Sequence, residues 1–365
     1  MKILVLCKRQ YTGRDLLDDT YGRLFRIPEA LIEGGHQVEG IALSYRSKPE
    51  GCFRLEQVTW HALNGLPFEP LSWHRYQKKF HEVVGQFRPD VVWCSSDVWH
   101  AIIGAKLCRQ YSIPFCIDLY DNYESFALAR LPGVVRLFHN ACRQADGITV
   151  VTSTLRHHLQ KNMRLGNVPT LLLGNAAADA FAPVSKQQAC ERLGLDPRAA
   201  YVGTAGALVV GRGIGVLLEA FKQLAETVPD CYLLLAGPGD ASLRRYHHDR
   251  LINLGVLSPD RVPLVFNALD VAVICNRPSA FGDYCYPQKF NEILACRTPL
   301  LAANVGEMAE ILADWPELLF SPASPESLAQ AMRAQLANPV LADIPVARWP
   351  DRAAQLAVFL QQFAC

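Results

Sequence analysis

The sequence predicts an α/β protein with two tandem domains, each built on a parallel β-sheet. Short apolar runs alternate with longer segments of helical period, as expected for βαβ units. This rhythm is interrupted by a polar stretch and then restarts, and 365 residues suffice for two hydrophobic cores. We therefore expect domains over residues 1–175 and 200–345, a linker over 176–199 and a terminal segment over 346–365.

Six apolar runs in the first half are expected to form strands. They cover residues 2–7, 37–43, 91–94, 115–119, 147–151 and 170–173. Helices are predicted over 24–33, which ends at Gly34-Gly35, and over 101–111, which ends before Pro114. These elements predict a doubly wound domain.

The second half repeats the alternation. Strands are expected over 201–206, 232–236, 253–255, 271–275 and 300–304, and helices over 216–226, 242–251, 289–295 and 308–313. Residues 351–363 carry apolar side chains at helical spacing and predict a terminal helix, which could return to the first domain.

Composition excludes several classes of protein. Half of the residues are hydrophobic, 19% are charged and the net charge is +1, which is typical of an ordered globular chain. No apolar run has the length of a membrane-spanning helix or of a signal peptide, so we expect a cytoplasmic protein. This expectation leaves open whether the protein associates with the inner face of the membrane. The twelve scattered cysteines lack metal-ligand spacing and are expected to be buried thiols, with no metal site.

Charge is unevenly distributed along the chain. Residues 1–175 contain 21 basic and 16 acidic residues, a net charge of +5, and the remainder has a net charge of −4. A basic first half indicates either an anionic partner, such as a lipid surface or phosphorylated acceptor, or chance surface bias. The excess is too small for a nucleic-acid-binding protein. The amphipathic segment 73–87 fits a helix on an anionic membrane or one that covers a sheet, and we favour the second.

A glycine-rich segment at residues 201–221 is the first candidate site. A strand leads into a loop with glycines from Gly206 to Gly215 and one cation, Arg212, and then into an amphipathic helix. Free backbone N–H groups, a helix N-terminus and a guanidinium together suit a phosphate or diphosphate. The alternative is that the glycines only tighten a βα turn. The spacing is neither that of a dinucleotide fingerprint nor that of a P-loop.

The second candidate site follows the strand at 271–275. Pro287 fits the first turn of the next helix, and Lys289 and Glu292 share one face of that helix. A cation there can bind phosphate while a carboxylate binds sugar hydroxyl groups. The alternative is a salt bridge between these two residues on a solvated face.

Together with weaker motifs in the same order, these segments resemble family 4 retaining glycosyltransferases with the GT-B fold. The motifs are Gly34-Gly-His-Gln-Val38, Pro89-Asp-Val-Val92, Ile113-Pro-Phe115, Ala145–Thr152, Leu173-Gly-Asn175, Phe181-Ala-Pro183, Arg212-Gly213, Leu235–Gly239, Pro287–Glu292 and Val305-Gly306 with Glu310. The resemblance implies two facing Rossmann-like domains. It also implies transfer of a hexose-type sugar from a UDP- or GDP-linked donor to a hydroxyl group of a surface glycan or glycolipid, with retention and without metal or other cofactor.

The resemblance also implies roles for particular residues. Arg212 would neutralise the donor diphosphate, Lys289 would assist it, and Glu292 would bind the ribose hydroxyl groups. Asp121 would face the reacting sugar from the first domain. The expected catalytic residues are thus Asp121, Arg212 and Lys289, and the expected donor-binding set adds Gly206, Leu257, Tyr284 and Glu292.

Three positions depart from the family pattern. Tyr284 stands where the first of two glutamates is usual, Ala207 replaces an arginine, and Asp18-Asp19 replace a glycine pair before the first helix. Asp283 is a candidate substitute for the missing glutamate. Two alternatives therefore stay open: a sugar-nucleotide epimerase of the same fold, and a catalytically inactive binding subunit of a glycan-assembly complex.

Overall fold

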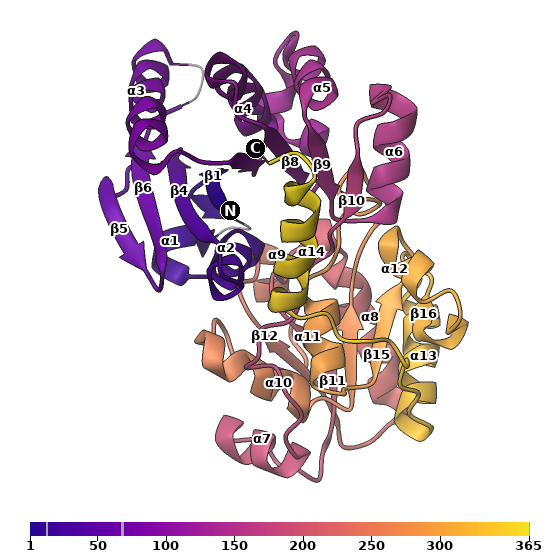
Figure 1. Ribbon diagram of the computed structural model, residues 1–365. Helices are drawn as coiled ribbons and strands as arrows, with labels where there is room; N and C mark the ends of the chain where they lie inside the picture. Colours follow the sequence, from indigo (N-terminus) through magenta and orange to yellow (C-terminus); the bar gives the residue numbers. More distant parts are fainter. Residues whose placement is uncertain (12–13, 67–68, 365) are drawn as a thin grey trace. The chain divides into compact units, whose positions relative to one another are not determined.

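The computed structural model describes residues 1–11, 14–66 and 69–364. The chain forms two compact units, which we describe separately. The first unit contains Met1–Asn175 and Trp349–Cys365, and the second contains Ala176–Arg348. Each unit has one large, mainly parallel sheet with helices packed against it (Figure 1), so the predicted α/β fold class is confirmed.

The sheet of the first unit has the strand order β10-β9-β8-β7-β1-β4-β6-β5. Its strands are β1 (Lys2–Lys8), β4 (Gln37–Ser44), β5 (Gly51–Leu55), β6 (Val58–Asn64), β7 (Val91–Ser95), β8 (Phe115–Leu119), β9 (Gly147–Val150) and β10 (Thr170–Leu172). All neighbouring strands are parallel except β5 and β6. The chain order reverses between β1 and β7, which makes their carboxyl ends a topological switch point.

Helices complete the first unit. They are α1 (Leu16–Asp19), α2 (Arg23–Glu33), α3 (Pro70–Phe87), α4 (Val98–Tyr111), α5 (Val134–Gln144), α6 (Ser153–Met163) and the terminal α14 (Trp349–Gln361). Two 3₁₀ turns, η1 (Tyr123–Ser125) and η2 (Ala127–Arg130), lie between β8 and α5. The terminal helix packs against α2, and a Cβ on Gly147 would lie 2.8 Å from the rings of Phe359 and Phe363.

The amphipathic helix α3 covers the sheet, as we favoured from its sequence. Tyr76, Phe80 and Val83 are buried, which accounts for the apolar stripe. Two of its cations are neutralised, because Arg75 pairs with Glu50 and Lys79 pairs with Glu82. Among the described residues, no helix is long and apolar enough to cross a membrane.

The sheet of the second unit is parallel throughout, in the order β13-β12-β11-β14-β15-β16. Its strands are β11 (Ala200–Ala205), β12 (Cys231–Ala236), β13 (Leu251–Asn253), β14 (Val271–Ile274), β15 (Leu300–Ala303) and β16 (Leu319–Phe320). The helices are α7 (Lys186–Leu193), α8 (Ile214–Thr227), α9 (Ala241–Arg245), α10 (Val262–Ala268), α11 (Lys289–Ala295), α12 (Glu307–Ile311) and α13 (Pro325–Ala337). The strand order reverses between β11 and β14.

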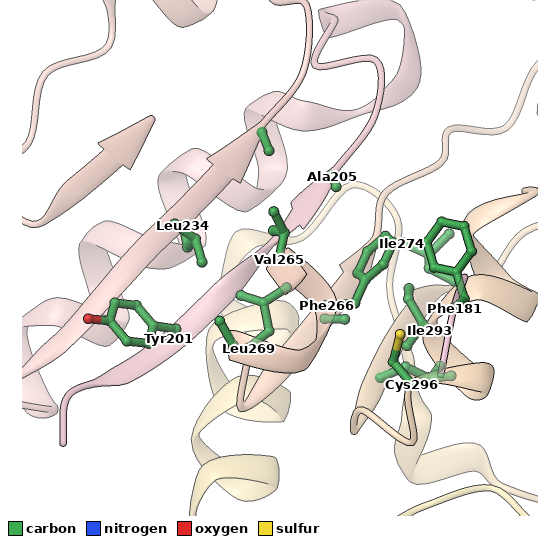
Figure 2. Close-up of a cluster of buried hydrophobic side chains, with 14 of the residues drawn as sticks. Phe181, Tyr201, Ala205, Leu234, Val265, Phe266, Leu269, Ile274, Ile293 and Cys296 are labelled. Carbon is green, nitrogen blue, oxygen red and sulfur yellow. The ribbon is translucent and has the colours of Figure 1, made fainter. Parts of the chain in front are cut away.

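Both faces of the second sheet are buried. On one face, residues of α10 and α11 pack against Tyr201 and Leu234 of the strands (Figure 2). On the other, α8 and α13 cover Val202 and Leu233. Because successive strand residues point to opposite faces, a parallel sheet covered on both sides reads as a continuous apolar run, which is why these strands were recognisable in the sequence.

The structure differs from the sequence-based expectation in several places. The polar stretch 176–199 is not a free linker, since it carries α7, which packs on α10 in the second unit. The hairpin β5–β6 was not expected at all. The helix expected over 242–251 is only α9, and β13 already begins at Leu251.

Candidate functional site

The candidate donor site lies at the carboxyl ends of β11 and β14. Two loops meet there: the glycine loop, residues 206–213, and the loop of residues 275–288 that precedes α11. In doubly wound sheets, ligands bind outside the carboxyl ends of the strands where the strand order reverses. The two segments selected from the sequence therefore lie at the ligand-binding position of this fold.

The neighbouring strand-end loop holds the glycine loop in place. A Cβ on Gly237, which follows β12, would lie 2.0 Å from the carbonyl oxygen of Gly206, so the two backbones touch. The N–H of Leu208 donates to the Pro238 carbonyl at 2.9 Å, and the N–H of Val210 donates to the Asp240 carboxylate at 2.8 Å. Glycines therefore do tighten this turn, as the alternative from the sequence proposed.

The glycine loop also packs against the loop after β14. Gly213 has φ +84°, and a Cβ there would lie 3.1 Å from Cγ of Arg277 and 3.2 Å from the Asn276 carbonyl oxygen. Asn276 orders its own loop: its Nδ2 donates to the Gly282 carbonyl at 2.9 Å, and its Oδ1 accepts the N–H of Arg277 at 3.0 Å. The side chain of Arg277 thus lies directly beside the glycine loop.

Lys289, the first residue of α11, reaches back to the end of β11. Its Nζ donates to Oγ1 of Thr204 at 3.0 Å, and a Cβ on Gly206 would lie only 3.4 Å from Nζ. Burial lowers the pKa of Lys289 to about 8, and the positive charge of Arg212 acts in the same direction. A partly desolvated ammonium group beside a glycine is arranged to receive an anion.

Arg212 supplies a second positive charge. It ends the 3₁₀ turn η3 (Val210–Arg212) and is exposed, with its guanidinium 4.8 Å from the centre of the Phe281 ring. This cation–π contact joins the glycine loop to the loop after β14. Within the described part of the chain, Arg212 forms no salt bridge with a carboxylate.

Glu292 lies one turn along α11 from Lys289. The residue is buried, with 6% of its surface exposed, and its carboxylate accepts a hydrogen bond from Nε2 of Gln288 at 3.2 Å. Its negative charge favours the protonated form of Lys289, so the two groups interact electrostatically. Pro287 precedes the helix instead of occupying its first turn.

The other expected donor-binding residues lie in turns around this site. Tyr284 closes a turn in which its N–H donates to the Phe281 carbonyl at 3.2 Å. Asp283 contributes backbone to the same region, because a Cβ on Gly306 would lie 2.6 Å from its carbonyl oxygen. Leu257 follows β13 and packs against the hydrophobic core of the second unit.

Asp121 belongs to the first unit, in the loop after β8. One carboxylate oxygen accepts the N–H of Asn122 at 2.8 Å. Its charge contributes to the raised pKa values of Tyr11 and Tyr120, for which burial is the main cause. The two tyrosine rings pack edge to face with centroids 5.1 Å apart. Asp121 thus stands at the carboxyl edge of the first sheet beside an aromatic cluster.

A buried ion pair supports this edge. Nη2 of Arg23, at the start of α2, donates to Oδ1 of Asp118 at 2.8 Å, and both side chains are fully buried. Asp118 also accepts hydrogen bonds from Ser95 at 2.7 Å and from Thr149 at 2.6 Å. The network therefore connects α2 to the carboxyl ends of β7, β8 and β9.

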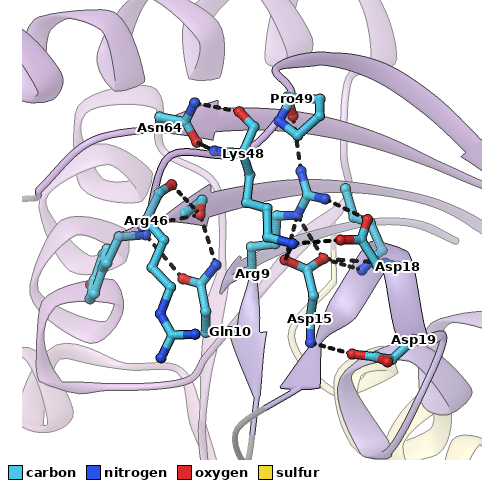
Figure 3. Close-up of polar contacts among 12 residues, drawn as sticks. Arg9, Gln10, Asp15, Asp18, Asp19, Arg46, Lys48, Pro49 and Asn64 are labelled. Carbon is cyan, nitrogen blue, oxygen red and sulfur yellow. Dashed lines mark hydrogen bonds and ion pairs between the residues drawn. The ribbon is translucent and has the colours of Figure 1, made fainter.

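The aspartates that replace the glycine pair are part of a second network (Figure 3). Nε of Arg9 donates to Asp15 at 2.7 Å, and Nη2 of Arg9 donates to Asp18 at 2.9 Å. Lys48 also donates to Asp18, at 2.7 Å, and Asp19 accepts the N–H of Asp15 at 2.7 Å. Ion pairs and a backbone-to-carboxylate hydrogen bond thus fix this loop.

Sequence reasoning missed Thr204, Asn276 and Arg277, which hold or flank the site. The available signal was their position, since each is a polar residue at the carboxyl end of a buried strand. It also missed the Arg23–Asp118 pair, although an aspartate inside an apolar strand is a recognisable anomaly. In the described part of the chain, no three His, Cys, Asp or Glu side chains are grouped as metal ligands would be.

Two family models match this chain. The model described as "Glycosyl transferase 4-like domain" matches residues 23–176, and the model described as "Glycosyl transferases group 1" matches residues 199–338. Together they span most of both units. The second match contains all of the candidate donor site, from Thr204 to Glu292.

Curated relatives match part of the chain. A D-inositol 3-phosphate glycosyltransferase from Rhodococcus jostii (strain RHA1) is 31% identical over 142 residues, which is 34% of this chain and 30% of the relative. D-inositol 3-phosphate glycosyltransferase 2 from Catenulispora acidiphila is 30% identical over 152 residues, 37% of this chain and 34% of the relative. The chain thus matches about a third of the length of these relatives.

Solved structures match over the whole chain. Sucrose-phosphate synthase from Thermosynechococcus elongatus superposes with a TM-score of 0.79 at 18% identity and covers 99% of both chains. HepE of Anabaena, solved in complex with UDP and glucose, superposes with a TM-score of 0.72 at 18% identity, also over 99% of both chains. At this level of identity, the likeness concerns the fold.

Proposed function

This chain belongs to the family 4 glycosyltransferases of the GT-B fold, and we propose that it moves a hexose-type sugar from a nucleotide-sugar donor to a hydroxyl group. The observation that supports this most strongly is the position of Lys289. Its ammonium group lies 3.0 Å from Thr204 and next to Gly206, at the switch point of the second sheet. Arg212 adds a cation that no described carboxylate neutralises.

The proposed chemistry follows from where charge develops. Cleavage of the sugar–phosphate bond places negative charge on the departing diphosphate, and fixed positive groups lower the barrier by stabilising that charge. Lys289 and Arg212 supply two such groups. The helix α8 begins at Ile214, directly after the glycine loop, so the positive end of its dipole adds to them.

We assign supporting roles to the neighbouring residues. Glu292 would bind ribose hydroxyl groups, while Gly206, Tyr284 and Leu257 would line the donor site. Arg277, whose side chain lies beside Gly213, would take the place of the cation that is missing at Ala207. Asp121, at the edge of the first sheet, would act on the acceptor side of the reaction.

We further propose that the reaction retains the anomeric configuration and needs no metal ion. With the diphosphate charge held by Lys289 and Arg212, one of its oxygens can take the proton of the acceptor hydroxyl as that hydroxyl attacks from the same face. No side chain is then required as a nucleophile. Nuclear magnetic resonance of the product's anomeric centre tests the stereochemistry, and EDTA tests the metal requirement.

The names of similar proteins support the choice of substrates. HepE has been solved with UDP-glucose, and another structural neighbour is the lipopolysaccharide outer core galactosyltransferase WaaB. A UDP-linked hexose as donor fits the HepE complex, and a surface glycan or glycolipid as acceptor fits the name of WaaB; we keep a GDP-linked hexose as the second donor class. The curated relatives carry a sugar-like phosphate acceptor in their name, which makes phosphorylated cyclitols part of the acceptor panel.

The decisive experiment incubates the protein with UDP-glucose, UDP-galactose or GDP-mannose and a panel of acceptors. Mass spectrometry should detect free UDP or GDP together with a product heavier by one hexose. Arg212→Ala should abolish most of this turnover, whereas Arg192→Ala, an exposed arginine on α7, should not change it. Isomerised donor without acceptor would indicate an epimerase, and donor binding without turnover would indicate a binding subunit.

A further inference from the structure

The positive charge of the first 175 residues is concentrated in one segment. Residues 127–166 contain six Lys and Arg residues and a single acidic residue, Asp146. The other residues of 1–175 contain fifteen basic and fifteen acidic residues. The whole excess of +5 therefore comes from the segment that holds η2, α5 and α6.

Five of these cations form an exposed surface, which we call the basic face: Arg130, Arg136, Arg143, Lys161 and Arg164. The helices α5 and α6 lie side by side (Figure 1). Nη1 of Arg143 donates to the carbonyl of Met163 at 3.1 Å, which joins the carboxyl ends of the two helices. The carboxyl ends of α5 and α6, which carry Arg143, Lys161 and Arg164, therefore lie against each other.

Among the residues that the structure describes, no carboxylate forms an ion pair with the basic face. The ion pairs of this region, within the described residues, join His139 and His158 to Glu124 and leave out all five cations. Asp146 is exposed; its Oδ2 accepts the N–H of Phe115 at 2.9 Å, and within the described residues its carboxylate forms no ion pair with these cations. On α3, by contrast, Arg75 and Lys79 are paired with glutamates. Unneutralised charge on this scale attracts an anionic partner.

Aliphatic side chains stand among these cations. Leu131 and Leu137 are 45% and 53% exposed, next in sequence to Arg130 and Arg136. The aromatic residue of the same helix, Phe138, is buried. Exposed leucines beside arginines suit a bilayer, because the guanidinium groups meet the anionic headgroups while the leucines enter the acyl boundary. A nucleic acid would instead favour exposed aromatic rings for base stacking.

We propose that the basic face of α5 and α6 binds the anionic lipid surface of a membrane. The proposal is independent of the donor site, since it rests on residues of the first unit alone. It places membrane contact on α5 and α6 and not on α3.

Vesicle sedimentation with the full chain tests this proposal. The protein should pellet with vesicles that contain phosphatidylglycerol and stay in solution with pure phosphatidylcholine. Each cation near an anionic surface contributes about fivefold in partitioning, so Arg130→Glu/Arg136→Glu should reduce binding by at least about 25-fold. Binding should also weaken as salt is raised.

A matched charge reversal controls for net charge. Lys78→Glu/Arg54→Glu changes two exposed cations outside the basic face by the same total charge, and binding should change by less than about twofold relative to the wild type. An uncharged pair, Leu131→Ser/Leu137→Ser, should lower partitioning by about tenfold through lost apolar insertion. Thermal unfolding confirms that each variant is folded.

Three results would overturn the proposal. The first is equal binding of the two charge-reversal variants, and the second is equal pelleting with neutral and anionic vesicles. The third is tight binding of an oligonucleotide by a protein that ignores anionic vesicles. UDP titration of the same samples reports the donor site separately, so failure of one proposal leaves the other measurable.

Discussion

The packing around Lys289 leaves its ammonium group partly desolvated, which suits it to bind an anionic ligand. Lys289 is the first residue of α11 and contacts the end of β11, and burial lowers the pKa of its ammonium group to about 8. Its Nζ donates a hydrogen bond to the neutral hydroxyl of Thr204. The folded protein therefore holds a partly desolvated charge that an anionic ligand would stabilise.

Replacing Lys289 by methionine should stabilise the protein and abolish donor binding. A lowered pKa means that the unfolded chain holds this proton more tightly, so the charge costs stability at pH 7 and the cost disappears as the pH rises from about 8 to 10.5. Removing the charge should contribute about 1–2 kcal/mol, or about 2–5 °C in the unfolding midpoint of the second unit. Calorimetry measures both effects, and a lower midpoint with intact nucleotide binding would refute the role of Lys289.

Nucleotide affinity should depend on pH through the same residue. Below pH 8, Lys289 is protonated and attracts the diphosphate; above this value the free protein loses the proton, and the association constant should fall about tenfold per pH unit. Lys289→Arg should make affinity nearly constant between pH 7.5 and 9.5, because arginine stays charged. Titrations across this range check the prediction, which fails if the wild type shows no slope.

The Arg23–Asp118 pair should behave as a coupled unit. Either single change, Arg23→Met or Asp118→Asn, leaves a buried charge without its partner and should cost about 3–5 kcal/mol. The double variant should cost less than the sum of the two, because no uncompensated charge remains. Thermal unfolding of the four proteins completes the cycle, and strictly additive costs would show that the pair is not coupled.

Burial decided which strands and helices could be predicted from the sequence. The central strands β1, β7, β8, β11, β12 and β14 are apolar runs because both of their faces are covered, so periodicity located them within a few residues. In the edge hairpin, β5 has no buried residue and β6 alternates buried with half-buried positions, and the hairpin includes Arg54, Glu56 and His61, so its apolar pattern is weak. The end of α9 depends on packing that no local pattern encodes.

In the glycine loop, too, the sequence predicts only part of the structure. Gly206, Gly213 and Gly237 are required by positive φ values and close backbone contacts, whereas Gly215 has open space around its hypothetical Cβ. The sequence does not distinguish these glycines. The cluster of Lys289, Arg212 and Glu292 could be anticipated from segment order and family resemblance, but Thr204 and Arg277 emerged only from the contacts between strand ends.

Two glycine substitutions should separate these cases. Gly237→Ala places a methyl group 2.0 Å from the Gly206 carbonyl and should destabilise the second unit by about 2–4 kcal/mol, with weaker nucleotide binding as the glycine loop moves. Gly215→Ala, in the first turn of α8, should be neutral or stabilising by up to about 1 kcal/mol. Unfolding midpoints provide the comparison, and equal effects would contradict the contact between the two strand ends.

For the whole molecule, the two units carry different chemistry. The second unit gathers the cations proposed for the donor, while the first carries the basic face on α5 and α6. The chain returns to the first unit through α14, which packs on α2. The sequence indicated this terminal helix from its apolar spacing, but its position depended on the absence of a side chain at Gly147, where a Cβ would lie 2.8 Å from the Phe359 ring.

The most direct test of the proposed donor site is calorimetric titration with UDP and with GDP, each with and without EDTA. We expect one of the two nucleotides to bind with micromolar affinity that EDTA does not change, and Lys289→Met to remove this binding. If neither nucleotide binds, or if EDTA abolishes binding, then Lys289 and Arg212 do not form the metal-independent diphosphate site on which the proposed function rests.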